Sequence, residues 1–178
     1  STIEENLKYF IISRKLKKHE LYLLRLGQLH QEMHNESLIF SFQLLDFKPF
    51  NFINNDLITD KMKIEMIEVP KGNFKQGSND IQFSFDNERP AFDQNVDSFK
   101  ISKYCITNDQ YLDFVLDGGY MKKEYWLENG WRWLKKKNLK HPIYWKLNEK
   151  NIWEEKVFGK YIRLRRNNPV VHVSYYEA

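Results

Sequence analysis

Two histidines four residues apart are the side chains in this sequence best suited to chemistry. His30 and His34 lie in the segment LHQEMHNE. On an α-helix this spacing puts both imidazoles on one face, with their Cβ atoms about 5–6 Å apart. Two neutral ring nitrogens placed in this way can bind one divalent metal ion, and imidazole suits iron, zinc, copper or nickel. The spacing also arises by chance on helix surfaces, so the pair alone leaves open a role as ordinary surface histidines.

Neither of the nearby candidate ligands is expected to complete a metal site. Glu36 lies two residues after His34, and at about 100° per residue its side chain points to roughly the opposite side of a helix. We therefore expect Glu36 to act indirectly, by orienting a ligand or by contacting a neighbouring helix. His19 lies about 16 Å from His30 along the axis of a continuous helix. A third ligand is expected from another helix.

Cys105 is the only cysteine, so no internal disulfide can form. A chain without disulfides is typical of a reducing compartment, and we expect a cytoplasmic protein. Because Cys105 lies in a strand-like segment ahead of a predicted helix, we expect it to be a small buried hydrophobic residue. The glycosylation sequon at residues 35–37 falls inside a helical pattern and is interpreted as coincidental.

The histidine pair lies in a long amphipathic pattern. Residues 13–45 contain no proline and one glycine, and their apolar residues recur at spacings of three, four and seven. This pattern predicts a helix of about 45 Å if it is continuous, with a possible preceding helix that ends near Ile12. Helices of this length are common in bundles, so we interpret residues 1–45 as the C-terminal part of a helical bundle.

The pattern changes twice after this helix. Residues 46–63 include Pro49 and several asparagines without a hydrophobic period, which predicts a linker. Residues 64–178 predict short strands at 64–69 and 74–76, a helix at 107–116, and many turns rich in glycine, proline, asparagine and aspartate. The fold class expected is α+β, with a loop-rich second domain whose tryptophans form its core.

Composition excludes several classes of protein. With 42% hydrophobic and 16% aromatic residues among 178, the chain has too much apolar surface to be disordered. No apolar run approaches the roughly 20 residues of a membrane span, and the N-terminal segment is unlike a signal peptide. The net charge of +4 is modest. The basic stretches at 135–137 and 163–166 are interpreted as solvated surface, so neither a membrane nor a nucleic acid is expected as a partner.

Several motifs of the second domain occur in a characteristic order. They are FDNERP at 85–90, ITNDQYLDF at 106–114, DGGY at 117–120, GW at 130–131 and PVVHVSYYEA at 169–178. In this order they resemble the N-terminal half of a formylglycine-generating-enzyme-like, or sulfatase-modifying-factor, domain, which has a C-type-lectin-like fold. The series from DGGY onward resembles the branch found in ergothioneine and ovothiol sulfoxide synthases. Those enzymes carry a DinB-like iron-binding bundle with the motif H-x-x-x-H-x-E, which His30, His34 and Glu36 match.

This resemblance implies an enzyme and its cofactor. The activity implied is O₂-dependent C–S bond formation at non-haem Fe(II), as in ergothioneine biosynthesis. Its substrates are a thiol, either cysteine or γ-glutamylcysteine, and a histidine derivative. His30 and His34 are the implied iron ligands. The third histidine, the catalytic residues and the substrate-binding residues belong to parts of the family's architecture that lie outside this chain. We therefore expect the chain to be a fragment that is inactive alone.

Two alternatives stay open. One is a formylglycine-generating oxidase acting on sulfatases, although that activity depends on a cysteine pair late in the domain and Cys105 is the only cysteine here. The other is a non-catalytic, truncated binding module. A cysteine pair in the later half of the domain would favour the first alternative over the sulfoxide synthase.

Overall fold

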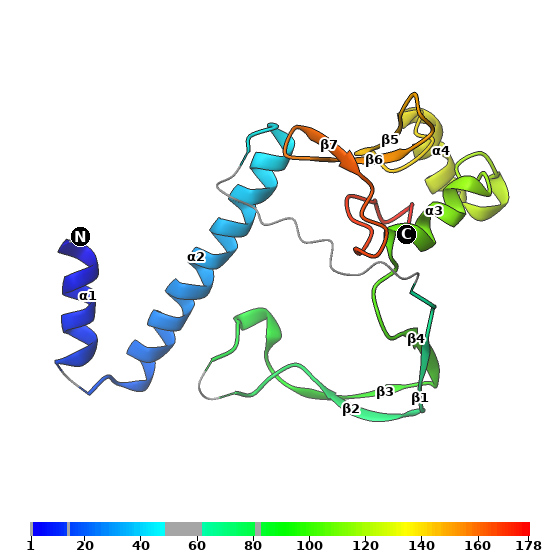
Figure 1. Cartoon of the computed structure of the whole chain (residues 1–178). Coiled ribbons are helices and arrows are strands. Elements are labelled where there is room, and N and C mark those ends of the chain that lie inside the picture. The colour runs from blue at the N-terminus through cyan, green and yellow to red at the C-terminus, as the bar shows by residue number, and fades with distance from the viewer. Residues whose placement is uncertain (1, 14, 49–61, 81–82) are drawn as a thin grey trace. The chain divides into compact units, whose positions relative to one another are not determined.

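The computed structural model of the chain describes residues 2–13, 15–48, 62–80 and 83–178 (Figure 1). The chain divides into two compact units. The first contains Ser1–Ile39 and Pro70–Ser98, and the second contains Phe40–Val69 and Phe99–Ala178. Among the described residues, no helix has the length and hydrophobicity that a membrane span requires.

The first unit contains the helices that the sequence predicted. α1 spans Thr2–Ile12 and α2 spans Lys18–Leu44, with the last turn of α2 belonging to the second unit. The long helix therefore begins at Lys18 and not at residue 13. A local hydrogen bond stabilises the start of this helix, because the Glu20 carboxylate accepts a hydrogen bond of 2.8 Å from the backbone N–H of Lys17. The helix ending at Ile12 agrees with the expectation from the sequence.

Two antiparallel strands complete the first unit. β2 (Gly72–Gln76) pairs with β3 (Phe92–Val96) in a register that places Phe74 opposite Gln94. The 3₁₀ turn η1 (Asp86–Glu88) lies between them in sequence. The expected strand at 74–76 is thus confirmed and extends back to Gly72.

The second unit is a mixture of helices and small sheets. β1 (Met66–Val69) pairs antiparallel with β4 (Phe99–Ser102), so the strand expected at 64–69 starts two residues later. β5 (Trp145–Leu147), β6 (Trp153–Val157) and β7 (Lys160–Arg163) form an antiparallel sheet in that order. α3 (Asn108–Leu116), η2 (Lys123–Tyr125) and α4 (Glu128–Lys137) precede this sheet in sequence. The fold class is α+β, as expected.

The core of the second unit is aromatic. Its buried hydrophobic residues are Tyr111, Leu112, Tyr120, Trp126, Leu134, Trp145 and Leu164. The remaining tryptophans (131, 133 and 153) are partly buried and pack against this cluster. The expectation of a tryptophan-containing core is confirmed.

Cys105 is exposed, which corrects the expectation that it is buried. It follows β4 in an irregular segment and does not lie within a strand. The buried positions come just afterwards, where the backbone N–H groups of Asn108 and Asp109 donate to the carbonyl oxygens of Asn168 and Arg166. The chain turns inward only at the start of α3, and Cys105 precedes that point.

The predicted linker is described only in part. Residues 49–61 lie outside the described residues, whereas Asp46 and Lys48 at one end and Met62 at the other are described. The boundaries predicted at 45/46 and 63/64, and the assignment of residues 1–45 to a DinB-like bundle, stay predictions.

Candidate functional site

The imidazoles of His30 and His34 lie together on one face of α2. Their ring centroids are 4.4 Å apart and their planes are nearly perpendicular, at 88°. Both side chains are exposed. The spacing argument from the sequence is therefore confirmed in its geometry, and the two rings offer nitrogen ligands of the type that Fe(II) accepts.

Glu36 does not join this pair in a three-ligand cluster. Within the described residues, no group of three or more histidine, cysteine, aspartate or glutamate side chains is arranged to hold a metal ion. His30 and His34 together offer two imidazole ligands. The roles of these two histidines as ligands, and of Glu36 as an indirect contributor, stay predictions.

The helix segment around the pair is reinforced on its exposed surface. Gln28 donates a hydrogen bond of 3.1 Å to Glu32, and Gln31 donates one of 3.2 Å to Asn35. Side-chain pairs four residues apart stabilise a helix by a few tenths of a kcal/mol each. These pairs flank His30 and His34 and favour the regular helix that keeps the imidazoles on one face.

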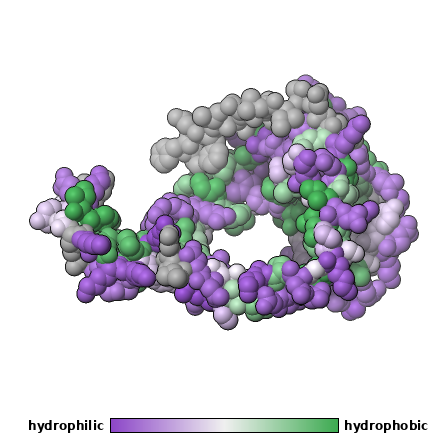
Figure 2. Space-filling view, turned by 90° about the horizontal axis from the view of Figure 1, so that it is seen from below, coloured by the Kyte–Doolittle hydropathy of each residue, from purple (hydrophilic) through white to green (hydrophobic). Residues whose placement is uncertain are grey.

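Large apolar side chains of α1 and α2 are exposed. Figure 2 shows hydrophobic residues at the surface of α1, on the left of the view. The exposed residues include Tyr9, Ile12, Leu23, Leu38, Phe40 and Leu44. Exposed apolar side chains on these helices agree with their interpretation as part of a larger bundle.

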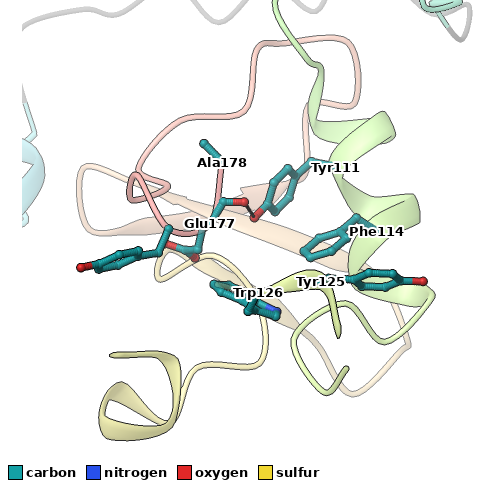
Figure 3. A pocket seen from close by; sticks show the side chains of 7 residues that line it. Tyr111, Phe114, Tyr125, Trp126, Glu177 and Ala178 are labelled. Atoms are coloured by element: carbon teal, nitrogen blue, oxygen red, sulfur yellow. Dashed lines mark hydrogen bonds between the residues drawn. The ribbon is translucent and has the colours of Figure 1, made fainter. Parts of the chain in front are cut away.

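A second candidate site is an aromatic pocket in the second unit (Figure 3). The pocket has a volume of about 210 Å³ and is lined by Tyr111, Phe114, Tyr125, Trp126, Tyr176, Glu177 and Ala178. α3 supplies Tyr111 and Phe114, while η2 supplies Tyr125. Gly119 lies behind Phe114, where a Cβ atom would overlap the phenyl ring. The second glycine of the DGGY motif, Gly119, thus permits Phe114 to pack closely against the backbone at the side of the pocket.

A buried carboxylate organises the pocket. Glu177 is 8% exposed, and its Oε1 accepts a hydrogen bond of 2.6 Å from the Tyr120 hydroxyl. Its Oε2 accepts one of 2.8 Å from the backbone N–H of Ser174. The Tyr111 hydroxyl donates to the backbone carbonyl of Glu177 at 3.2 Å. These bonds satisfy the carboxylate and join the DGGY and SYYEA segments.

The tyrosines of this network are donors and not bases at neutral pH. Burial raises the pKa of Tyr111 to about 12. Burial is also the main cause that raises the pKa of Tyr120, and the hydrogen bond to Glu177 raises it further. Both hydroxyls therefore keep their protons. The pocket can enclose an aromatic or apolar group, but these tyrosines do not supply a base.

Tyr125 is held at the edge of the pocket by an exposed polar cluster. Its hydroxyl donates to Asp117 at 3.1 Å, and the Lys122 ammonium donates to the same carboxylate oxygen at 2.8 Å. The hydrogen bond from Lys122 lowers the pKa of Asp117. The aspartate of the DGGY motif therefore positions a pocket side chain.

Sequence reasoning did not identify Tyr111, Tyr120 or Glu177 as a connected group. The sequence did contain a signal for these residues, because all three lie in motifs that carry the resemblance to sulfatase-modifying-factor domains. The contacts themselves join residues 57 and 66 positions apart. Local patterns do not reveal such long-range pairs.

Comparison with known proteins identifies relatives of the chain. Residues 55–178 match the family of sulfatase-modifying factor enzyme 1-like domains. Hercynine oxygenase of Mycobacterium tuberculosis is 37% identical over 95 residues, which cover 53% of this chain and 22% of that protein. Hercynine oxygenase of Mycolicibacterium smegmatis is 28% identical over 153 residues, which cover 84% of this chain and 35% of that protein. The chain thus spans about a fifth to a third of the length of these relatives.

Proposed function

Because the chain belongs to the family of sulfatase-modifying factor enzyme 1-like domains, we propose that it is part of an iron-dependent enzyme that joins a thiol to a histidine derivative using O₂. The matched proteins support this proposal, since their name describes an oxygenase of hercynine. The expected resemblance to sulfoxide synthases of ergothioneine biosynthesis agrees with these names.

The observation that carries the proposal is the pairing of His30 and His34 on one face of α2. Their ring centroids lie 4.4 Å apart, and both rings are exposed. These two residues would hold Fe(II), and Glu36 would act indirectly. A bound Fe(II) would supply open coordination positions for O₂ and the thiol. The thiol substrate is cysteine or γ-glutamylcysteine.

In this proposal, the residues of the chain bind the metal ion and shape the substrate pocket. The two imidazoles would orient the ion, and the helix that bears them is supported by side-chain hydrogen bonds between residues 28 and 35. The aromatic core, organised by Glu177 and its tyrosine donors, would form a wall that shapes the substrate pocket and excludes water. The cytoplasm, where thiols stay reduced, is the proposed location.

The experiment uses the chain extended to the length of the hercynine oxygenases. Oxygen uptake is measured with Fe(II) and hercynine, with cysteine and with γ-glutamylcysteine in separate reactions, and the products are identified by mass spectrometry. We expect uptake that requires both hercynine and one thiol, and a product containing a new C–S bond. Uptake without hercynine, or no uptake with either thiol, would contradict the proposal.

The same preparation tests the alternatives. A sulfatase-derived peptide containing cysteine is offered in place of hercynine. Conversion of its cysteine to formylglycine would establish the sulfatase-modifying activity instead. Absence of turnover with every substrate, together with the absence of bound iron, would favour a non-catalytic binding module.

A further inference from the structure

The aromatic pocket of the second unit has buried and solvent-exposed parts (Figure 3). Trp126 and Glu177 form its buried part and are 9% and 8% exposed, whereas Tyr125 and Tyr176 are 51% and 40% exposed. Every residue that lines it belongs to the second unit. A small ligand can therefore enter from solvent, and the shape of the pocket is defined within this unit alone.

The rings of the pocket are held in place by residues that do not line it. The Trp126 indole donates a hydrogen bond of 2.8 Å to the carbonyl oxygen of Gly119. The Tyr125 hydroxyl donates to Asp117, and the Phe114 ring packs closely on Gly119. A site whose side chains are already ordered loses less entropy when a ligand binds. These rings thus form a preorganised wall.

The pocket combines aromatic rings with a carboxylate. Of the seven described residues that line it, five carry aromatic rings and one is Glu177. The carboxylate oxygens of Glu177 accept hydrogen bonds from the Tyr120 hydroxyl and the Ser174 backbone N–H. An ionised carboxylate can accept about four hydrogen bonds. Glu177 therefore keeps acceptor capacity and negative charge available to a ligand.

This combination favours a cation that carries methyl groups in place of N–H groups. The faces of aromatic rings attract cations, and cages of such rings bind quaternary ammonium groups. A primary ammonium in the same pocket would lose hydrogen bonds to water that aromatic walls do not replace. A trimethylammonium group has no N–H donor to leave unsatisfied, and its four heavy atoms fit a volume of about 210 Å³.

A lysine near the pocket does not oppose such a ligand. The Lys122 ammonium lies 5.3 Å from the centre of the Tyr125 ring and 2.8 Å from the Asp117 carboxylate. The tyrosine ring thus already contacts one cation, and the aspartate compensates the charge of that cation. This ion pair leaves Glu177 to attract a cation inside the pocket.

We propose that the aromatic pocket binds a small quaternary ammonium compound, with its methyl groups against the rings of Tyr125, Trp126 and Tyr176 and its charge compensated by Glu177. This site depends neither on the histidine pair nor on the reaction proposed above. The competing occupant is a neutral apolar group of the same shape, because burial alone would also favour it.

The first experiment compares three ligands of the same size on the 178-residue chain by NMR titration. They are choline, its uncharged isostere 3,3-dimethylbutan-1-ol, and the primary ammonium ethanolamine extended by methyl groups on carbon, 2-amino-3,3-dimethylbutan-1-ol. We expect saturable shifts of the Trp126 indole signal with choline, and at least about fivefold weaker binding of the other two. The absence of saturable shifts with choline, or equal affinity for the uncharged isostere, would overturn the proposal.

Two neighbouring tyrosines test the location of the site. Tyr176→Leu removes a ring that lines the pocket. Tyr175→Leu is the matched control, because Tyr175 is 87% exposed and is not among the lining residues. Choline affinity should fall at least threefold in Tyr176→Leu and stay unchanged in Tyr175→Leu. Equal losses in the two variants, or no loss in Tyr176→Leu, would overturn the proposed location.

Glu177→Gln tests the role of the carboxylate. This substitution keeps an acceptor for Tyr120 and removes the charge, so choline affinity should fall at least threefold while affinity for the uncharged isostere changes less than twofold. Should the variant fail to fold by circular dichroism, added salt replaces it. Salt should weaken choline binding to the parent by screening the carboxylate, and leave the isostere unaffected. Choline affinity that does not respond to either change would overturn the role of Glu177.

A peptide containing trimethyllysine distinguishes a small-molecule site from a docking site for a modified protein. An affinity less than tenfold above that of choline supports the small-molecule site, because only the methylated group is then recognised. A greater affinity would overturn this part of the proposal.

Discussion

At the scale of single residues, the buried carboxylate of Glu177 explains why two distant motifs occur together. A buried carboxylate is costly unless donors satisfy it. The donors here are the Tyr120 hydroxyl and the Ser174 backbone N–H. The tyrosine of DGGY and the glutamate of SYYEA therefore depend on each other, and replacing either one removes one hydrogen-bond partner of a buried polar group.

The pKa of Tyr111 predicts a loss of stability at high pH. Its usual pKa of 10.0 is raised to about 12, chiefly by burial. A group whose pKa is raised in the folded state stabilises the fold fully below its unfolded pKa, and this contribution is lost as the pH rises. We expect the free energy of unfolding, measured in urea, to fall between pH 10 and 12.

Two tyrosine substitutions identify the source of this decline. Tyr111→Phe removes the titrating hydroxyl and should make the decline shallower. Tyr175→Phe is the control, because Tyr175 is 87% exposed and should leave the decline unchanged. Equal slopes in the two variants would contradict the assignment to Tyr111.

At the scale of elements, the start of α3 shows local sequence determining local structure. The Thr107 hydroxyl accepts from the backbone N–H of Gln110 at 3.3 Å, and the Gln110 side chain accepts from the backbone N–H of Thr107 at 3.0 Å. This reciprocal pair is a capping box. The helix predicted at 107–116 is therefore found at Asn108–Leu116, with Thr107 as its cap.

Removal of this cap should destabilise the second unit measurably. Thr107→Ala is expected to lower the free energy of unfolding by about 1 kcal/mol, since the N–H of Gln110 loses its acceptor. Thr107→Ser keeps the hydroxyl and should recover most of this loss. Chemical denaturation followed by tryptophan fluorescence provides the measurement, and equal stability of the alanine and serine variants would argue against the capping role.

Elements with local signals could be predicted, whereas contacts between distant segments could not. The hydrophobic period predicted α2, and cap residues predicted α3. The long helix begins at Lys18 and not at residue 13, because Leu16 continues the apolar spacing ahead of the true start. The spacing of His30 and His34 correctly predicted that their rings share a face. The hydrogen bonds of the Gln43 side chain to the backbone of Lys156 and Phe158 connect residues 113 and 115 positions apart, and no local pattern encodes them.

At the scale of the whole molecule, the imidazoles of His30 and His34 lie together, but the described residues contain no cluster of three metal ligands. We therefore expect the 178-residue chain alone to consume O₂ at the background rate when supplied with Fe(II), hercynine and a thiol. The oxygen-electrode trace should match that of a His30→Ala, His34→Ala double variant. Turnover clearly above this control would show that the active site lies wholly within the chain.

The central claim is that His30 and His34 bind iron, and iron content tests it most directly. The chain extended to the length of the hercynine oxygenases is purified, and its iron is quantified by inductively coupled plasma mass spectrometry. His30→Ala and His34→Ala should each abolish stoichiometric iron, because each removes a ligand. Glu36→Gln should retain a measurable fraction, because the loss of an indirect partner typically weakens metal affinity by about 10–100-fold. Full iron in either histidine variant would contradict the claim, and iron lost as completely in Glu36→Gln would make that carboxylate a ligand.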